Sequence, residues 1–222
     1  LKAPLEVIDA IKYAGFNGVT LANNHFYDYG EAGVVDTIRS LTMYNVDFVG
    51  AGLNLAEARQ VLYKSISGKV VAFINCCEHE YSIATDSTAG SNPLNPIRIY
   101  QSIKEARMKA DYVIVIVHGG IEGYQLPTPR MQETYRYFVE VGADVVVNHH
   151  QHCYSGYEYY YGKPIFYGLG NFSFDWDGKR KSIWNEGFML KLSIDANGIN
   201  HELFPYIQGD EIPGVILMQE EK

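Results

Sequence analysis

Three of the seven histidines in this 222-residue chain lie within four positions, in the stretch DVVVNHHQHCYSG. Side chains on an extended segment point to alternate sides, so His150 and His152 would face the same way and His149 the other way. A His-X-His pair of this kind is suited to binding metal ions such as Zn²⁺. The spacing favours a metal site, and the alternative interpretation is a solvated histidine-rich loop.

Two further polar motifs also follow apolar, strand-like runs. His118 comes directly after VIVIV, and Asn24 and His25 follow GVTLA, with Asp28 a little further along. In an open α/β sheet, binding groups collect beyond the carboxyl ends of the strands. An asparagine oxygen can bind a hard or borderline cation, and a histidine can act as a general acid when a carboxylate fixes its tautomer. The other interpretation is a polar turn whose asparagines cap the next helix.

Several other residues near these motifs have both a structural and a functional interpretation. Glu122 is close enough in sequence to His118 to reach the same cleft, and Arg130 can bind an anion, although both residue types are more often at the surface. Cys153 is a thiolate ligand or a small packed residue, and no second cysteine stands at ligand spacing. Asn171 binds a ligand or braces a turn. The stretch YSGYEYYYGKPIFY is an aromatic wall for a polymer or ordinary sheet packing.

Hydrophobic periodicity predicts helices and strands in alternation along most of the chain. Helices are expected at about residues 4–14, 31–44, 54–60, 97–109 and 130–141. Strands are expected at about 18–23, 46–50, 61–76 with a turn at Gly68, 112–117 and 144–148. Residues 78–96 look like a long polar excursion, and the part after residue 164 looks like strands joined by short turns, with Asn197-Gly198 as a hairpin signal. Apolar strands separated by helices favour a layered α/β fold.

Composition excludes several classes of protein. The net charge of −8 offers no basic surface for nucleic acid, so no nucleic-acid partner is expected. The longest apolar run, YVIVIV, is far shorter than the roughly 20 residues that cross a bilayer. The three cysteines, two of them adjacent, do not imply a disulfide framework. The chain begins without Met and directly in a helix-like rhythm, so we expect a fragment or a processed product.

Four motifs together resemble the CapA family of bacterial poly-γ-glutamate capsule biosynthesis proteins, in the calcineurin-like metallophosphoesterase superfamily. They are, in the family's order, LANNHFYDYG, VGAGLNLAEA, IVHGGIEGYQLPTPRMQETYRYFVEVGADVVVNHHQH and GKPIFYGLGNFSFD. The resemblance covers about residues 5–207. It implies an α/β fold, the metallophosphoesterase-like four-layer αββα sandwich, with its N-terminal part missing. Residues 1–222 are then expected to form a single, N-terminally incomplete domain.

The resemblance also implies a set of site residues. It assigns Asn24, His118 and His150 to one metal ion, His152 to the other, His25 as the acid and Asp28 as its partner. Two divalent ions are implied in the full-length protein, with Mn, Fe, Zn and Mg not distinguished. Asn148 and His149 stand where the family usually has small residues. The family's early acidic motifs would lie before Leu1, so this chain offers three ligands to one ion and one to the other.

The function that the resemblance implies is metal-dependent phosphoester hydrolysis in capsule biosynthesis. Two divalent ions about 3.5 to 4 Å apart polarise a phosphoryl group and activate water. The expected partners are a phosphoester substrate or a polyanionic polymer, together with membrane-bound capsule synthesis proteins, and the expected location is the bacterial cell surface outside the cytoplasm. The alternative function is a non-catalytic, polymer-binding or scaffold component of the capsule machine. A (β/α) barrel hydrolase agrees poorly with the β-rich end of the chain.

Overall fold

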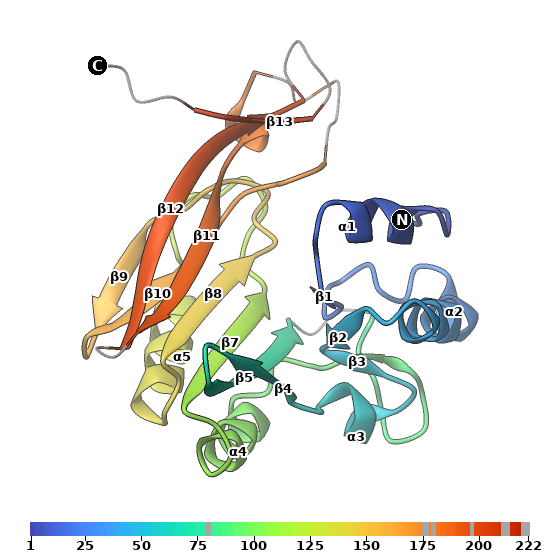
Figure 1. Ribbon diagram of the computed structural model, residues 1–222, viewed down its shortest axis with the longest axis horizontal. Helices are drawn as coiled ribbons and strands as arrows, with labels where there is room; N and C mark the ends of the chain where they lie inside the picture. Colours follow the sequence, from blue (N-terminus) through green and yellow to red (C-terminus); the bar gives the residue numbers. More distant parts are fainter. Residues whose placement is uncertain (79–80, 175–177, 179–180, 196–197, 210–213, 219–222) are drawn as a thin grey trace. The chain divides into compact units, whose positions relative to one another are not determined.

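The computed structural model describes residues 1–78, 81–174, 178, 181–195, 198–209 and 214–218 (Figure 1). The chain divides into two compact units. The first consists of Leu1–Lys64 and Val70–His118, and the second of Ser65–Lys69 and Gly119–Lys222. The expected single domain stays a prediction.

The first unit alternates short helices and strands, as the periodicity predicts. Its helices are α1 (Val7–Tyr13), α2 (Gly30–Met43), α3 (Leu55–Ala58) and α4 (Pro96–Arg107). Its strands are β1 (Gly18–Thr20), β2 (Asp47–Val49), β3 (Ala51–Gly52), β4 (Leu62–Ile66), β5 (Lys69–Cys77), β6 (Gly90–Ser91) and β7 (Tyr112–His118). The turn between β4 and β5, Ser65–Lys69, is counted with the second unit. Gly68 lies in that turn with φ +77°, as expected.

Parallel strands carry the first unit's polar motifs to their carboxyl ends. β5 and β7 are parallel, with Cys77 opposite His118 at the end of the register. β1 and β2 are also parallel, and β3 pairs antiparallel with the short strand β6 from the polar excursion. The apolar run of β7 is buried at Val113, Val115 and Val117, and α4 packs against this strand. His118 is therefore the first polar residue after the buried apolar run.

A buried asparagine joins the loop after β1 to strands β5 and β7. The side chain of Asn75 is 1% exposed; its Oδ1 accepts from the Ala22 amide at 2.8 Å, and its Nδ2 donates to the Ile116 carbonyl at 3.1 Å. Asn92 donates through Nδ2 to the Asn75 carbonyl at 2.8 Å. At Gly50, with φ +94°, a Cβ would lie 2.0 Å from Asn75 Oδ1, so this close approach requires glycine.

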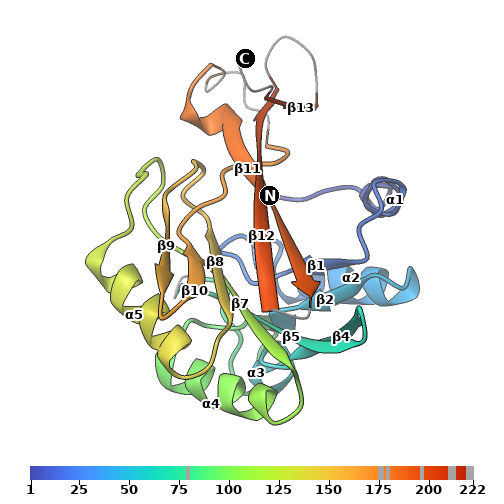
Figure 2. The ribbon, with the colours of Figure 1, turned by 60° about the vertical axis from the view of Figure 1, so that its left-hand side comes forward.

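The second unit contains one α-helix among its described residues and two groups of strands. Its helices are α5 (Pro129–Glu140) and the 3₁₀ helix η2 (Ile183–Asn185). Its strands are β8 (Val145–His149), β9 (Tyr157–Tyr160), β10 (Lys163–Phe166), β11 (Glu186–Asp195), β12 (Gly198–Gln208) and β13 (Val215–Leu217). β10 pairs parallel with β8 and antiparallel with β9, whereas β11, β12 and β13 form an antiparallel sheet (Figures 1 and 2).

Helix α5 packs on strands β8 and β10 of the second unit (Figure 2). It begins after Thr128, whose side chain accepts from the Met131 amide at 3.2 Å, and Pro129 occupies its first turn. Tyr135 and Phe138 are fully buried on the face towards the sheet. The helix thus brings the Tyr135 hydroxyl next to the end of β8.

The tyrosine-rich stretch forms strand β9 and its turn to β10, as the sheet interpretation predicts. Tyr157 and Tyr159 alternate with Glu158 along β9 and remain about half exposed, at 49% and 59%. The hairpin expected near Asn197-Gly198 is present as the pairing of β11 with β12, where Asp195 faces Gly198. Asn197 itself lies outside the described residues. Within the described part of the chain, no helix is long and apolar enough to span a membrane.

Replacing Asn75 by Ala should destabilise the protein. The change leaves the buried Ala22 amide and Ile116 carbonyl without these partners, which costs about 1–3 kcal/mol in the free energy of unfolding. Urea denaturation measures this loss. Asn200→Ala is the matched control, because its amide bonds Asp195 at an exposed position and its loss should change stability by less than about 0.5 kcal/mol. Equal effects of the two substitutions would contradict the proposed role of Asn75.

Candidate metal centre

The His-X-His pair lies on a sharply turning loop and not on an extended segment. Strand β8 ends at His149, and both His150 and His152 have positive φ values, +116° and +56°. The prediction of an extended geometry is wrong, because the chain leaves the sheet one residue before the pair. The two rings nevertheless lie close together, with centroids 5.9 Å apart. Their convergence comes from the turn of the loop.

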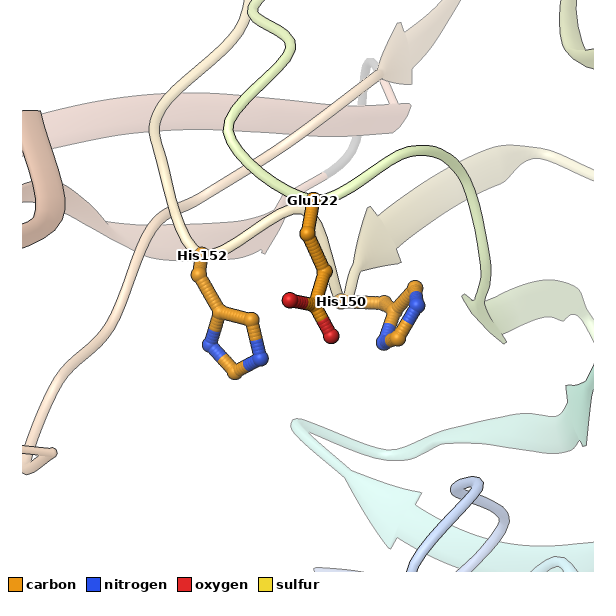
Figure 3. Close-up of side chains that lie close together, drawn as sticks. All are labelled: Glu122, His150 and His152. Atoms are coloured by element: carbon orange, nitrogen blue, oxygen red, sulfur yellow. The ribbon is translucent and has the colours of Figure 1, made fainter.

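The carboxylate of Glu122 lies close to the imidazole rings of His150 and His152. One ligand atom each from Glu122, His150 and His152 lies within 4.8 Å of the others. Figure 3 shows the Glu122 carboxylate between the two rings, with the three side chains extending from two neighbouring loops. Glu122 is exposed, whereas His150 is 9% exposed. Two imidazoles and one carboxylate at this spacing form a ligand set for a divalent cation.

Two backbone hydrogen bonds hold these loops together. The Gly119 amide donates to the His149 carbonyl at 2.8 Å, and the Gly123 amide donates to the Gln151 carbonyl at 2.7 Å. Glu122 lies between the two glycines in sequence, so its backbone is tied on both sides to the segment that carries the histidines. The proximity of Glu122 to the pair therefore follows from main-chain contacts.

The side chain of Asn148 links the same two loops from inside. It is fully buried; its Nδ2 lies 2.9 Å from the Gly119 carbonyl and 2.7 Å from Gln151 Oε1, and also contacts the Tyr167 carbonyl at 3.0 Å. Its Oδ1 accepts from the Tyr135 hydroxyl at 2.7 Å. A buried amide without such partners would cost free energy. The site thus depends on the buried amide of Asn148, which bonds to both loops.

Asn171 determines which nitrogen of His152 carries the proton. Asn171 Nδ2 donates to the carbonyls of His152 and Trp184 at 3.2 and 3.0 Å, so its Oδ1 is the acceptor that faces His152 Nδ1 at 2.7 Å. The Nδ1–H form of the ring leaves the Nε2 lone pair available for a cation. Trp184 stacks on the ring, with centroids 4.5 Å apart. Asn171 therefore orients the ring of His152. The sequence points to Asn171 only as a residue that binds a ligand or braces a turn, and it gives no signal for Trp184.

Three neighbouring residues do not belong to the cluster of Glu122 and the histidine pair. Burial lowers the pKa of His149 to about 4, so its ring is neutral near pH 7. Cys153 is buried and its pKa is raised by burial, which favours the packed thiol over the thiolate ligand. Cys76, Cys77 and Cys153 are buried and form no disulfide bond with one another. Arg130 is exposed on the first turn of α5.

The first unit brings two other predicted ligands together. Asn24 Oδ1 lies 3.0 Å from His118 Nε2, although the residues are 94 positions apart. The turn before Asn24 is held by Ser82, whose hydroxyl donates to the Asn23 carbonyl at 2.6 Å, and by Ser91, whose hydroxyl donates to the same carbonyl at 3.2 Å. The polar excursion therefore supports this motif, a role that its sequence does not reveal.

His25 and Asp28 form the expected pair in the same turn. His25 Nδ1 lies 3.0 Å from Asp28 Oδ2, and both side chains are partly exposed. The interpretation of a polar turn is correct for Asn23, whose Oδ1 accepts from the His25 amide at 2.9 Å. The helix-capping part of it is wrong, since α2 begins after Tyr29 without a side-chain cap.

The structure thus places Asn24 with His118 in the first unit, and His150 with His152 in the second. That all four serve one metal site stays a prediction, and so does the assignment of His25 as the acid. Glu122, which the sequence places only near the cleft, lies with the histidine pair.

Comparison with known proteins identifies the family. The model for "Bacterial capsule synthesis protein PGA_cap" matches residues 1–176. The chain belongs to this family. The resemblance drawn from the four motifs is therefore confirmed, and this PGA_cap chain is a member of a capsule and poly-glutamate biosynthesis family.

Two relatives of this PGA_cap chain come from Bacillus. Capsule biosynthesis protein CapA of Bacillus anthracis is 37% identical over 181 residues, which cover 79% of this chain and 44% of the relative. PGA biosynthesis protein CapA of Bacillus subtilis (strain 168) is 35% identical over 203 residues, which cover 89% of this chain and 52% of the relative. The chain spans about half the length of these curated relatives.

A solved structure described as a novel phosphatase of Mycoplasma pneumoniae has a similar fold. The match has a TM-score of 0.62 at 15% identity and covers 94% of this chain and 78% of that chain. The likeness concerns the fold alone. The PGA_cap chain has the α/β, metallophosphoesterase-like fold that the resemblance implies.

In this PGA_cap chain, replacing Asn171 by Ala should change the tautomer of His152. Without the acceptor at 2.7 Å from Nδ1, the metal-free ring should shift towards the Nε2–H form. Nitrogen NMR chemical shifts of the histidine rings measure the two forms. The signals of His201, whose Nδ1 lies 3.1 Å from the Tyr159 hydroxyl, should stay unchanged and serve as an internal control. An unchanged His152 spectrum would contradict this role of Asn171.

Proposed function

We propose that this chain provides the metal-dependent hydrolytic part of a phosphoesterase-like protein in capsule polymer biosynthesis. The observation that carries the proposal is the convergence of Glu122, His150 and His152. The fold shared with a phosphatase and the membership of a capsule synthesis family support it. The fold likeness alone would not suffice, because one fold serves many chemistries.

The residues of the cluster fit a divalent cation. His152 has its Nε2 lone pair directed away from Asn171, which occupies Nδ1. His150 is buried, so its ring loses little further freedom when it binds a metal, and Glu122 supplies the negative charge. A cation held there would polarise a phosphoryl group and activate water for attack on phosphorus.

The chain's other polar residues have separate roles in the proposal. Asn24 and His118 provide a second pair of ligands, and close to two cations per protein are then expected. His25 donates a proton to the leaving oxygen, and the Asp28 carboxylate beside Nδ1 orients the ring for this step. The nitrogen that delivers the proton is Nε2, because Nδ1 faces Asp28.

The biological setting of the proposal follows from the relatives. Those from Bacillus are named for capsule and PGA biosynthesis. We propose a phosphoester substrate encountered during synthesis or export of a polyanionic polymer, a location at the bacterial cell surface, and membrane-bound capsule synthesis proteins as partners. Metal-free protein that binds polyglutamate without hydrolysing phosphoesters would instead favour the accessory, non-catalytic role.

Replacing His150 by Ala should remove both metal binding and hydrolysis. The purified protein is loaded with Mn²⁺ or Zn²⁺ and assayed with bis(p-nitrophenyl) phosphate, and its metal content is measured by mass spectrometry. We expect the variant to lose at least about 100-fold in kcat/KM, since the cation supplies the main stabilisation of the transition state.

The matched control is His201→Ala, because His201 lies in the same unit and contacts Tyr159 and not the cluster. It should retain the metal content and activity of the wild type. Wild-type protein that contains no divalent metal and hydrolyses no phosphoester after loading would rule out the proposed function.

A further inference from the structure

We propose that a surface pocket of the first unit binds the carboxylate group of an acidic, amide-linked chain such as an oligomer of glutamate. The pocket lies where α3, the start of β4 and α4 meet, and α3 and α4 are near each other in both views (Figures 1 and 2). Its volume is about 450 Å³, in the range of small-molecule sites. The inference goes beyond the proposed function, because the pocket shares no residue with the metal centre or the His25–Asp28 pair.

Most of the pocket wall is polar or charged. Ala56 and Val61 are its apolar residues, and the others carry hydrogen-bonding side chains: Arg59, Gln60, Tyr63, Ser102, Glu105 and Lys109. Within the described part of the chain, the side chains of Arg59, Glu105 and Lys109 form no hydrogen bond or ion pair. Two cationic groups and one carboxylate are therefore available to a ligand.

The guanidinium of Arg59 is held without an acceptor. Arg59 follows the last residue of α3, and its Nε is buried with no hydrogen-bond partner among the described residues. The start of α3 is fixed by two hydrogen bonds, in which Asn54 Oδ1 accepts from the Glu57 amide at 3.0 Å and Glu57 Oε2 accepts from the Leu53 amide at 2.9 Å. A buried donor without an acceptor costs free energy. A ligand oxygen would supply the acceptor after a rotation of the side chain that uncovers Nε.

Helix α4 and the turn after it provide the opposite wall. Ser102, Glu105 and Lys109 follow at intervals of three and four residues, so they lie on one helix face. Ser102 is 6% exposed, whereas Glu105 and Lys109 are exposed. The Lys109 ammonium lies 5.9 Å from the centre of the Tyr63 ring. Burial, and then the charge of Glu105, raise the pKa of Tyr63, so its hydroxyl stays protonated and can donate.

The charges of the pocket match a ligand with a single negative charge. Arg59 and Lys109 are positive and Glu105 is negative, which gives a sum of +1. A carboxylate neutralises this charge, and the planar guanidinium fork fits its two oxygens. A phosphate group carries roughly −1.5 to −2 near pH 7, and Glu105 would repel it more strongly. The pocket therefore favours a carboxylate over a phosphate.

Two other residues favour a ligand that also contains amide groups. The Glu105 carboxylate only accepts hydrogen bonds, so an N–H group of the ligand would satisfy it. The Gln60 side chain both donates and accepts, as an amide bond does. Ala56 and Val61 offer apolar contact to methylene groups. An acidic side chain on an amide-linked backbone has all of these features, and the exposed positions of Gln60, Glu105 and Lys109 leave room for the chain to continue.

Fluorescence anisotropy tests the site. The purified protein is titrated into fluorescein-labelled hexaglutamate, once with α-linked and once with γ-linked residues, at about 0.15 M salt, where charges more than about 8 Å from the ligand are largely screened. We expect saturable binding, although the net charge of −8 repels an anionic chain. Binding of either oligomer supports the site, and the tighter one shows which linkage the pocket accepts. Inorganic phosphate should compete less effectively than the unlabelled oligomer.

Replacing Arg59 by Gln should weaken the binding of the oligomer at least about 10-fold, because hydrogen bonds between two charged groups are lost. Arg98→Gln is the matched control. It removes the same charge from an exposed position of α4, where Arg98 bonds to Gln101 at 3.1 Å outside the pocket. This variant should bind the oligomer as the wild type does.

A second pair of variants keeps the test independent of any folding defect in Arg59→Gln. Lys109→Gln changes an exposed residue and should weaken binding several-fold. Its control is Lys104→Gln, because the Lys104 ammonium also lies 5.9 Å from the centre of a tyrosine ring, that of Tyr100, but does not line the pocket. The control should retain the wild-type affinity.

Replacing Glu105 by Gln tests the selectivity. The variant loses the negative charge that repels phosphate, so phosphate should compete more effectively than it does with the wild type. A residue that only supports the fold would not change the ratio of the two affinities.

The outcomes separate this proposal from the proposed function. The pocket assignment is wrong if neither oligomer binds saturably, if Arg59→Gln and Arg98→Gln have the same affinity, or if phosphate competes better than the oligomer. It is also wrong if His150→Ala abolishes the binding, because the oligomer would then bind at the metal centre. Loss of hydrolysis in His150→Ala with unchanged oligomer binding supports both proposals, whereas a wild type without metal or hydrolysis leaves the pocket assignment standing.

Discussion

The candidate metal centre depends on a buried amide whose hydrogen-bonding groups are all used. Asn148 has no exposed surface and both of its side-chain polar atoms have partners. An amide is suited to this position because its Nδ2 carries two donor hydrogens while its Oδ1 accepts from Tyr135. A hydroxyl has one donor hydrogen and a carboxylate has none, so either would leave a backbone carbonyl unmatched. Its burial is favourable only while both loops stay in place. The hydrogen bonds of Asn148 therefore act together with the two backbone contacts between the loops in fixing the positions of Glu122 and the histidine pair.

In the first unit, polar side chains also form hydrogen bonds with backbone groups where strands end. Where strands end, the chain leaves the regular ladder, and its amide and carbonyl groups need other partners. Asn75 provides them for the loop after β1, and the hydroxyls of Ser82 and Ser91 do so at Asn23. These residues come from β5 and from the polar excursion, so the short turn that carries Asn24 is supported by distant parts of the sequence. Polar side chains with both donors and acceptors recur at these strand ends because irregular backbone needs them.

The pair of His150 and His152 also shows how a correct expectation can rest on the wrong local geometry. The alternation of side chains on a strand predicts that His150 and His152 face the same way. They do converge, but on a loop with positive φ at both residues. Such a conformation carries a modest backbone strain for residues other than glycine, and surrounding contacts must compensate for it. The hydrogen bonds of Asn148 and Asn171 are contacts of this kind.

The sequence alone determined the order of helices and strands, the α/β class and the placement of histidines at strand ends, because periodicity and the end of an apolar run are local signals. Its four motifs also determined the family. Only the tertiary structure decided that Glu122 joins the histidine pair and that Asn171 orients His152. Glu122 and Asn171 are 30 and 19 residues away from His152, and their approach depends on loop conformations and buried hydrogen bonds. No periodic pattern encodes such contacts, since they arise only when separate segments pack together.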